Sequence, residues 1–144
     1  MAGFEHYGGS APRVEWYPKI ASTVMAVGDL VYADGSGAVQ PADATSGDHI
    51  GIMTKPIAAT DSDYASTTEV PVLVPLDDTT WKVAVGTGTF TTAMVGSRYD
   101  LKDANEIDVS ATAKLVVTIV GYISATEAIV KINAMIANAN VATS

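Results

Sequence analysis

The feature that most constrains the fold is the apolar stretch at residues 115–132, LVVTIVGYISATEAIVKI. Two runs rich in β-branched residues flank a short polar link, Ser124–Glu127, and this pattern predicts a β-hairpin. Apolar side chains fall on both faces of the first strand, so we expect a central strand that is covered on both sides. On the return strand, the alternation predicts one apolar face and one polar face. The apolar face would hold Val130, Ile132 and Ala134, and the polar face Lys131 and Asn133.

A helix is the alternative for the second half of this stretch. Ser124 followed by Glu127 matches a capping box, and Ile129, Ile132 and Ile136 lie at helical spacing. Against the helix stand the β-branched residues between 129 and 132, which favour strands. We therefore prefer the hairpin.

The rest of the chain predicts short strands at regular intervals with turn signals between them. The expected strands cover 27–32, 38–40, 49–53, 69–76, 79–85, 98–101 and 107–109. Prolines 71 and 75 place the 69–76 strand at an edge or at a bulge, because proline cannot donate to a ladder. Such spacing is typical of an all-β fold. We expect a small β-barrel, β-tulip-like or sandwich domain over 23–136, with an extended N-terminal arm (1–22) and a flexible tail (137–144).

The N-terminal arm is unusual in its composition. Glycines and prolines oppose regular structure here, yet Phe4, Tyr7, Trp16 and Tyr17 lie in this segment and its charges cancel. Disordered segments are usually poor in aromatic residues, so the arm is expected to dock. Docking on a neighbouring molecule makes these four aromatic residues the candidate partner-binding residues. Docking on the chain's own domain is the alternative.

The sequence also contains a faint internal similarity. Val27-Gly28 and Tyr32 precede Ile50-Gly51-Ile52, and Val95-Gly96 and Tyr99 precede Val120-Gly121. Glycines at these places would suit bulges or bends in a curled sheet. A true repeat and a chance similarity are both compatible with so short a pattern.

Length and charge exclude several classes of protein. The 144 residues fit one domain, and 16 acidic against 8 basic residues give a formal net charge of −8, which disfavours binding to phosphate backbones. The absence of cysteine excludes disulfides, thiolate zinc sites and cysteine nucleophiles. The longest uncharged apolar run is too short to span a membrane, and the N-terminus lacks the pattern of a secretory signal. We expect no membrane and no nucleic-acid partner.

No set of residues predicts catalysis. His6 and His49 have no partner at ligand spacing, and Gly86-Thr87-Gly88 is not followed by the lysine of a phosphate loop. A group of acidic residues could hold Ca²⁺, but its spacing is not that of an EF-hand, and a solvated acidic turn is the preferred interpretation. The group consists of Asp100, Asp103, Glu106 and Asp108. Trp81 and Tyr99 could form a sugar platform, but the alternation around Trp81 favours core packing. We expect no enzyme, cofactor or metal.

The order of these features resembles the small capsid decoration (cement) proteins of tailed bacteriophages. The resemblance rests on the aromatic arm, Val-Gly-Asp-Leu-Val at 27–31, the turn at 34–37, Ile50-Gly51-Ile52, the proline-flanked strand at 70–76 and Val-Gly-Ser-Arg-Tyr-Asp-Leu at 95–101. It implies a domain that binds the outer surface of a phage head and bridges subunits of the major capsid protein. It also implies a virion location and a homo-oligomer, with a trimer favoured and a dimer possible.

Other non-enzymatic functions fit the same observations. A carbohydrate-binding β module on a virion would need exposed aromatic residues on one sheet face. A tail-tube or head-completion subunit would assemble into rings or tubes. The sequence alone leaves these alternatives open.

Overall fold

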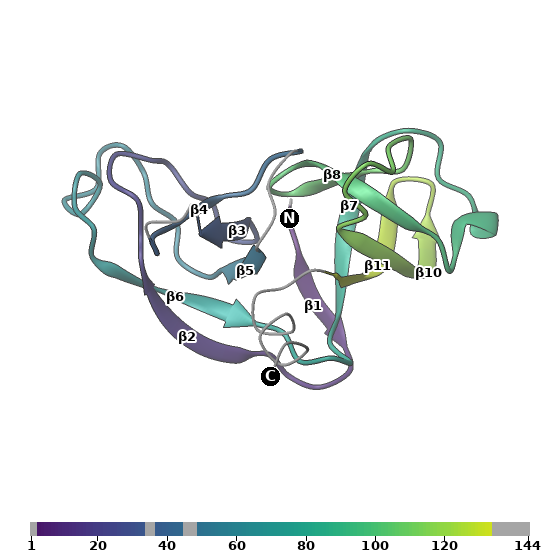
Figure 1. The fold of residues 1–144 in the computed structure, drawn as a ribbon, viewed down its shortest axis with the longest axis horizontal. Coiled ribbons are helices and arrows are strands. Elements are labelled where there is room, and N and C mark those ends of the chain that lie inside the picture. Colours follow the sequence, from purple (N-terminus) through teal and green to yellow (C-terminus); the bar gives the residue numbers. More distant parts are fainter. Residues whose placement is uncertain (1–2, 34–36, 45–48, 134–144) are drawn as a thin grey trace.

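The computed structural model describes residues 3–33, 37–44 and 49–133. Within these ranges the chain forms β-strands and one 3₁₀ turn, which confirms the all-β class with a small barrel (Figure 1). The first five strands are β1 (Glu5–Gly8), β2 (Arg13–Pro18), β3 (Leu30–Ala33), β4 (Val39–Pro41) and β5 (His49–Met53). Then follow β6 (Glu69–Val74), β7 (Thr80–Thr87), η1 (Thr92–Met94), β8 (Arg98–Asp103), β9 (Glu106–Asp108), β10 (Val117–Ser124) and β11 (Glu127–Ile132).

One sheet closes into a five-stranded barrel. Its order is β1-β7-β11-β10-β8-β9, and β7 also pairs in parallel with β9, which completes the ring. β1 lies outside the ring as an antiparallel strand on the first half of β7. Trp81 and Val83 of β7 are fully buried in this barrel, as the alternation of the strand predicts. The burial of Trp81 excludes it from a sugar-binding platform.

The other sheet repeats the same topology. Its strand order is β2-β6-β5-β3-β4, and the strand order of the barrel is β7-β11-β10-β8-β9. Subtracting five from each strand number of the barrel gives the order of this sheet. Here too the outer strands approach in parallel, through a bridge between Lys19 and Val39. The chain therefore has two halves of the same topology, the first formed by β2–β6 and the second by β7–β11. The repeat that the sequence suggested is present in this strand order.

The strand pairing also aligns the two halves, and it confirms the match of Val27-Gly28 with Val95-Gly96 that the sequence suggested. Val39 of β4 and Ile107 of β9 have equivalent places, because each is the parallel partner of the strand across the closure of its sheet. Val39 lies opposite Ala33 of β3, and Ile107 lies opposite Leu101 of β8. This alignment matches Gly28 with Gly96, and both glycines have positive φ (94° and 96°) just before their strands. The tyrosines at 32 and 99, in contrast, are one position out of register.

The two halves share part of their core. One apolar cluster joins Phe4, Leu30 and Ile52 of the first half to the interior of the second barrel. The Leu30 N–H donates to the Ala104 carbonyl over 2.7 Å, which ties β3 to the β8–β9 turn. A second cluster around Val31, Val39 and the valines of β6 fills the first half alone. The shared cluster makes the halves one packed unit.

The predicted hairpin is present, and the helical alternative is wrong. β10 and β11 pair antiparallel from Val117–Ile132 to Ser124–Glu127. The expectation that β10 is covered on both sides is also wrong, because Val120, Tyr122 and Ile123 are each 38–39% exposed. β8 pairs with β10 only at Val117 and Thr118, so the second half of β10 extends beyond its neighbour. Ala134 and the predicted tail at 137–144 lie outside the described residues.

The proline-containing strand β6 is interior and not at an edge, between β2 and β5. The Lys19 N–H donates to the Thr68 carbonyl over 3.1 Å, and hydrogen-bonded pairs alternate along an antiparallel ladder. Trp16 and Pro71 therefore form a non-hydrogen-bonded pair, in which the missing N–H of Pro71 points away from β2. The β5 ladder contacts β6 only at Val72 and Leu73. An interior strand thus tolerates this proline.

Two other expectations need smaller corrections. The strand expected from residue 27 begins at Leu30, because Ala26–Asp29 form a turn in which the Asp29 N–H donates to the Ala26 carbonyl. Leu115, expected on the hairpin, precedes β10 and has a φ of 53°.

Candidate interaction surface

The N-terminal segment is extended, but it docks on its own chain. β1 pairs with β7 of the second half, and β2 pairs along its whole length with β6 of the first half. The structure therefore shows the alternative that the sequence left open.

The four aromatic residues of this segment have different environments. Phe4 is 2% exposed and packs in the shared core, so it is not available at the surface. Tyr17 is partly buried against the core of the first half, and this burial, together with the nearby Glu15 carboxylate, raises the pKa of its hydroxyl. Tyr7 and Trp16, in contrast, are 57% and 59% exposed. Of the four predicted partner-binding residues, these two remain accessible.

Trp16 belongs to an apolar surface on the outside of the first half. Side chains that lie directly opposite in an antiparallel ladder share a face, so Val14 and Trp16 lie on the same face as Leu73 and Pro71. Val14 is 54% exposed. We call these four residues the β2 surface. The opposite face of β6 carries the buried valines 70, 72 and 74.

A pocket adjoins the β2 surface through Leu73. Its volume is about 430 Å³, and it lies between β1 and the β5–β6 pair. Its lining includes His6 and the apolar residues Phe4, Val27, Ile52 and Leu73. The apolar character of the β2 surface therefore continues into a concave region.

A second apolar surface lies at the far end of the other half. Val120, Tyr122 and Ile123 are exposed on the free half of β10, and the Tyr122 ring stacks on Phe90 at a centroid distance of 5.1 Å. The exposed Val95 is next to them, because the Gly96 N–H donates to the Ile119 carbonyl over 2.8 Å. We call Val95, Val120, Tyr122 and Ile123 the β10 tip. Sequence patterning missed this surface because it predicted that β10 is buried on both faces.

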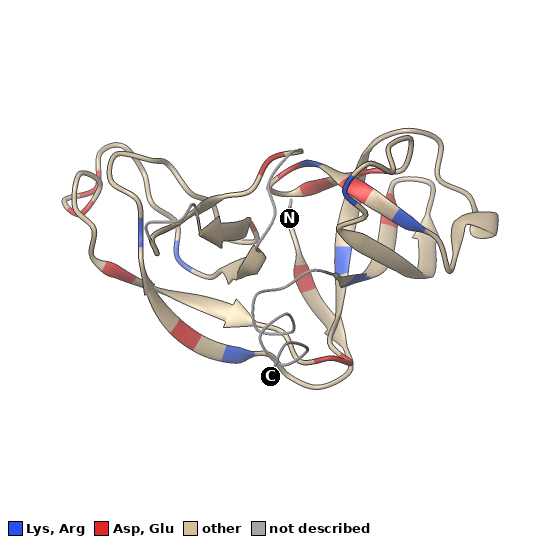
Figure 2. Cartoon of the chain, viewed as in Figure 1, with Lys and Arg blue, Asp and Glu red and all other residues tan. Residues whose placement is uncertain are grey.

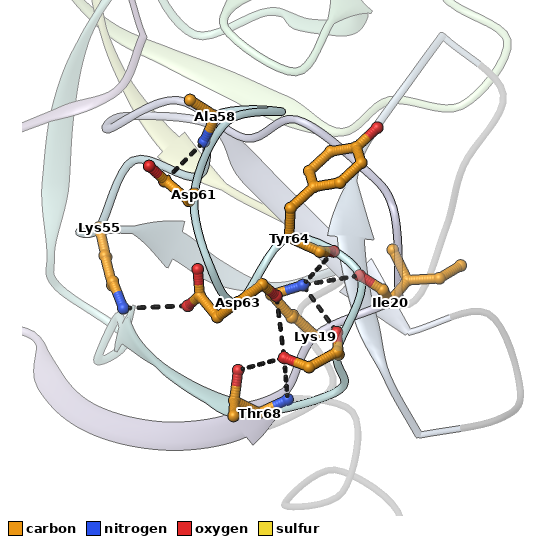
Figure 3. A network of polar contacts seen from close by, with 9 residues as sticks. Lys19, Ile20, Lys55, Ala58, Asp61, Asp63, Tyr64 and Thr68 are labelled. Atoms are coloured by element: carbon orange, nitrogen blue, oxygen red, sulfur yellow. Dashed lines mark hydrogen bonds and ion pairs between the residues drawn. The ribbon is translucent and has the colours of Figure 1, made fainter.

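Lys19 is a further residue that the sequence did not single out. It is fully buried, and its Nζ donates to the carbonyls of Tyr64 and Ser66 over 2.9 and 2.7 Å (Figure 3). A weaker contact of 3.5 Å reaches the Ile20 carbonyl. The ammonium group thus holds the loop before β6 against the end of β2. Its signal in the sequence is slight, since Lys19 follows a proline at a strand end like many exposed lysines.

The acidic residues near β8 and β9 serve the fold. Asp100 is 4% exposed, so the expected solvated turn is wrong for this residue. Its carboxylate accepts the N–H groups of Ala113, Lys114 and Leu115 over 3.0, 2.7 and 2.7 Å. Asp108, nearer the surface, accepts the Ser110 N–H over 2.8 Å.

Asp29 is a further buried carboxyl group close to the β8–β9 turn. Desolvation raises its pKa, although its Oδ2 accepts the Ala26 N–H over 2.9 Å. Its Oδ1 also accepts a long contact from Asn105 Nδ2, at 3.4 Å. This arrangement fits a structural link between the two halves and offers no nucleophile or base beside a second reactive group.

Within the described ranges, no three His, Asp or Glu side chains come close enough to hold a metal ion. The same part of the chain contains no helix that is long and apolar enough to cross a membrane. Acidic residues occur on both halves, and β2 carries one basic and one acidic band (Figure 2). The features that stand out are thus the two apolar surfaces.

No model of a known protein family matches the chain, and no curated protein matches it.

Proposed function

We propose that the chain is a structural virion protein that binds the outer surface of a phage capsid and stabilises it by bridging subunits of the major capsid protein. The observation that carries the proposal is the presence of two separate exposed apolar surfaces on one acidic β domain. The β2 surface belongs to the first half and the β10 tip to the second, and the strands β2 and β10 themselves lie toward opposite ends of the molecule (Figure 1).

Two separated contact surfaces suit a bridging protein. One capsid subunit would contact Trp16 and Val14, and its neighbour would contact Tyr122 and Ile123. Tryptophan and tyrosine are the side chains that most often dominate binding energy at protein interfaces. Attachment through two sites, repeated over a shell, raises the overall affinity without any strong single contact.

The experiment is a binding assay on purified heads that lack the protein. Trp16→Ser should weaken binding about 30-fold or more, since an interfacial tryptophan contributes about 2 kcal/mol or more. Tyr122→Ser combined with Ile123→Ser should weaken it through the other surface. Val24→Ser is the matched control, because Val24 is 57% exposed and belongs to neither surface.

Both surface variants should reduce occupancy, and their combination should abolish it. Unchanged occupancy with either variant would contradict the bridging role of that surface. Unchanged occupancy with the combined variant, or no binding of the wild-type chain, would refute the proposal.

A further inference from the structure

The repeat allows the environment of β2 to be compared with that of its counterpart β7. The second half of β7 pairs in parallel with β9, and its first half is covered by β1, with Glu5 opposite Lys82 and Gly8 opposite Thr80. Both stretches of this strand edge therefore have a partner.

In the first half only one of these two partners is present. Lys19 corresponds to Val85 by two observations. The Lys19 N–H donates to the Thr68 carbonyl just before β6, as the Val85 N–H donates to the Thr126 carbonyl just before β11. Lys19 also pairs in parallel with Val39 of β4, as Val85 does with Ile107 of β9. Counting back, Val14 and Trp16 correspond to Thr80 and Lys82. No described strand pairs with this stretch of β2 on its outer side.

The hydrogen-bonding groups at this edge point outward. Because Lys19 directs its N–H toward β6, the alternation of the ladder directs those of Val14 and Trp16 away from β6. The Ile20 N–H, which has the same direction, donates to the Val39 carbonyl over 3.0 Å, and this contact confirms the assignment. An open edge of this kind is a template for another strand.

We infer that the open edge of β2 binds the β2 strand of a second copy of this chain, antiparallel, with Val14 opposite Val14 on a two-fold axis. Charge complementarity between the two copies favours this register. In this register Arg13 of each copy lies opposite Glu15 of the other, in two equivalent ion pairs. Shifting the register by two residues in either direction places Arg13 opposite Arg13 or Glu15 opposite Glu15.

The main chain also fits this register. Val14 would exchange two hydrogen bonds with Val14, and each Trp16 N–H would reach the carbonyl of Pro12. Pro12 has no N–H to return, so the pairing is shorter than the ladder inside each copy. The faces that carry Trp16 stay exposed on the joined sheets. The inference therefore does not depend on capsid binding.

The test is sedimentation velocity of the isolated protein over a range of concentrations. The wild-type chain should form dimers, and Arg13→Glu and Glu15→Arg should each sediment as monomers. An equimolar mixture of the two variants should form heterodimers, because position 13 of one copy and position 15 of the other would again carry opposite charges. The double variant should form homodimers again.

Folding does not confound this test, because the Arg13 and Glu15 side chains are exposed. Lys114→Glu is the control, since it changes the net charge as Arg13→Glu does but lies away from β2. It should dimerise like the wild type.

A wild-type chain that stays monomeric, or single variants that still dimerise, would overturn the inference. So would a mixture of the two variants that stays monomeric. If removal of residues 134–144 abolished the association, that segment and not the β2 strand of a second copy would be its partner at the edge. This result would equally overturn the inference. None of these measurements involves a capsid, so their result is independent of whether the proposed function is correct.

Discussion

Replacing Asp100 by alanine tests how the second half is held together. The Asp100 residue is 4% exposed, and its carboxylate accepts three consecutive main-chain N–H groups from the loop that leads into β10. The same loop contains Leu115 with a positive φ, so it adopts its shape with little help from local preference. Alanine would leave the three donors without their acceptor.

The magnitude follows from these contacts. A hydrogen bond to a charged acceptor contributes about 1.5 to 3 kcal/mol, and three bonds to one group add less than their sum. We expect Asp100→Ala to lower the free energy of unfolding by about 3 to 5 kcal/mol. Asp100→Asn keeps an acceptor for the two bonds to Oδ1 and should cost about 1 to 2 kcal/mol.

The assay is urea unfolding followed by the fluorescence of the buried Trp81. With a urea dependence of about 2 kcal/mol per molar, the alanine variant should shift the midpoint by about 1.5 to 2.5 M. Asp108→Ala is the control, because Asp108 also accepts a main-chain N–H but nearer the surface, and it should cost less than about 1 kcal/mol. A loss below about 1 kcal/mol for Asp100→Ala would refute the role of this network.

Three further predictions concern single polar groups. Lys19→Met should lower the free energy of unfolding by about 2 to 4 kcal/mol in the same assay, because two partly buried loop carbonyls lose the donor that the buried Lys19 supplies. For Asp29, burial raises the folded pKa, so its carboxyl group stabilises the fold fully below its ordinary pKa of 3.8 and loses this contribution as the pH rises through the raised value. The stability of Asp29→Asn relative to the wild type should therefore increase with pH across this window, and a difference that is constant with pH would contradict the assignment. The Ser10 hydroxyl, which donates to the Asp78 carboxylate over 2.9 Å, lowers the pKa of that group. NMR titration of Ser10→Ala should show this pKa moving back up toward 3.8.

The alternation of apolar and polar residues predicted the positions of the strands well, but it predicted poorly which strands lie side by side in the sheets. The period-two alternation correctly placed the hairpin and the burial of Trp81, and the strand at 49–53 has the predicted bounds. Alternation does not say which strand lies alongside. Tyr122 is exposed on the part of β10 that extends past the first residue of β8, which lies beside Thr118, and nothing in the β10 sequence encodes where β8 begins.

The candidate site shows the same division. Sequence identified Tyr7 and Trp16 as candidate partner-binding residues, but it could not separate them from Phe4, whose burial depends on distant parts of the chain that form the shared core. The open edge of β2 became visible only when strand pairing revealed the repeat, because it is defined by comparison with β1 and β7.

The most direct test of the proposed capsid binding is to look for this chain by quantitative mass spectrometry in purified phage particles, together with limited proteolysis of the intact particles. A capsid-binding subunit that coats the shell predicts a copy number comparable to that of the major capsid protein, and protease access without disruption of the head. Absence from the particle, or only a few copies per particle, would contradict the claim.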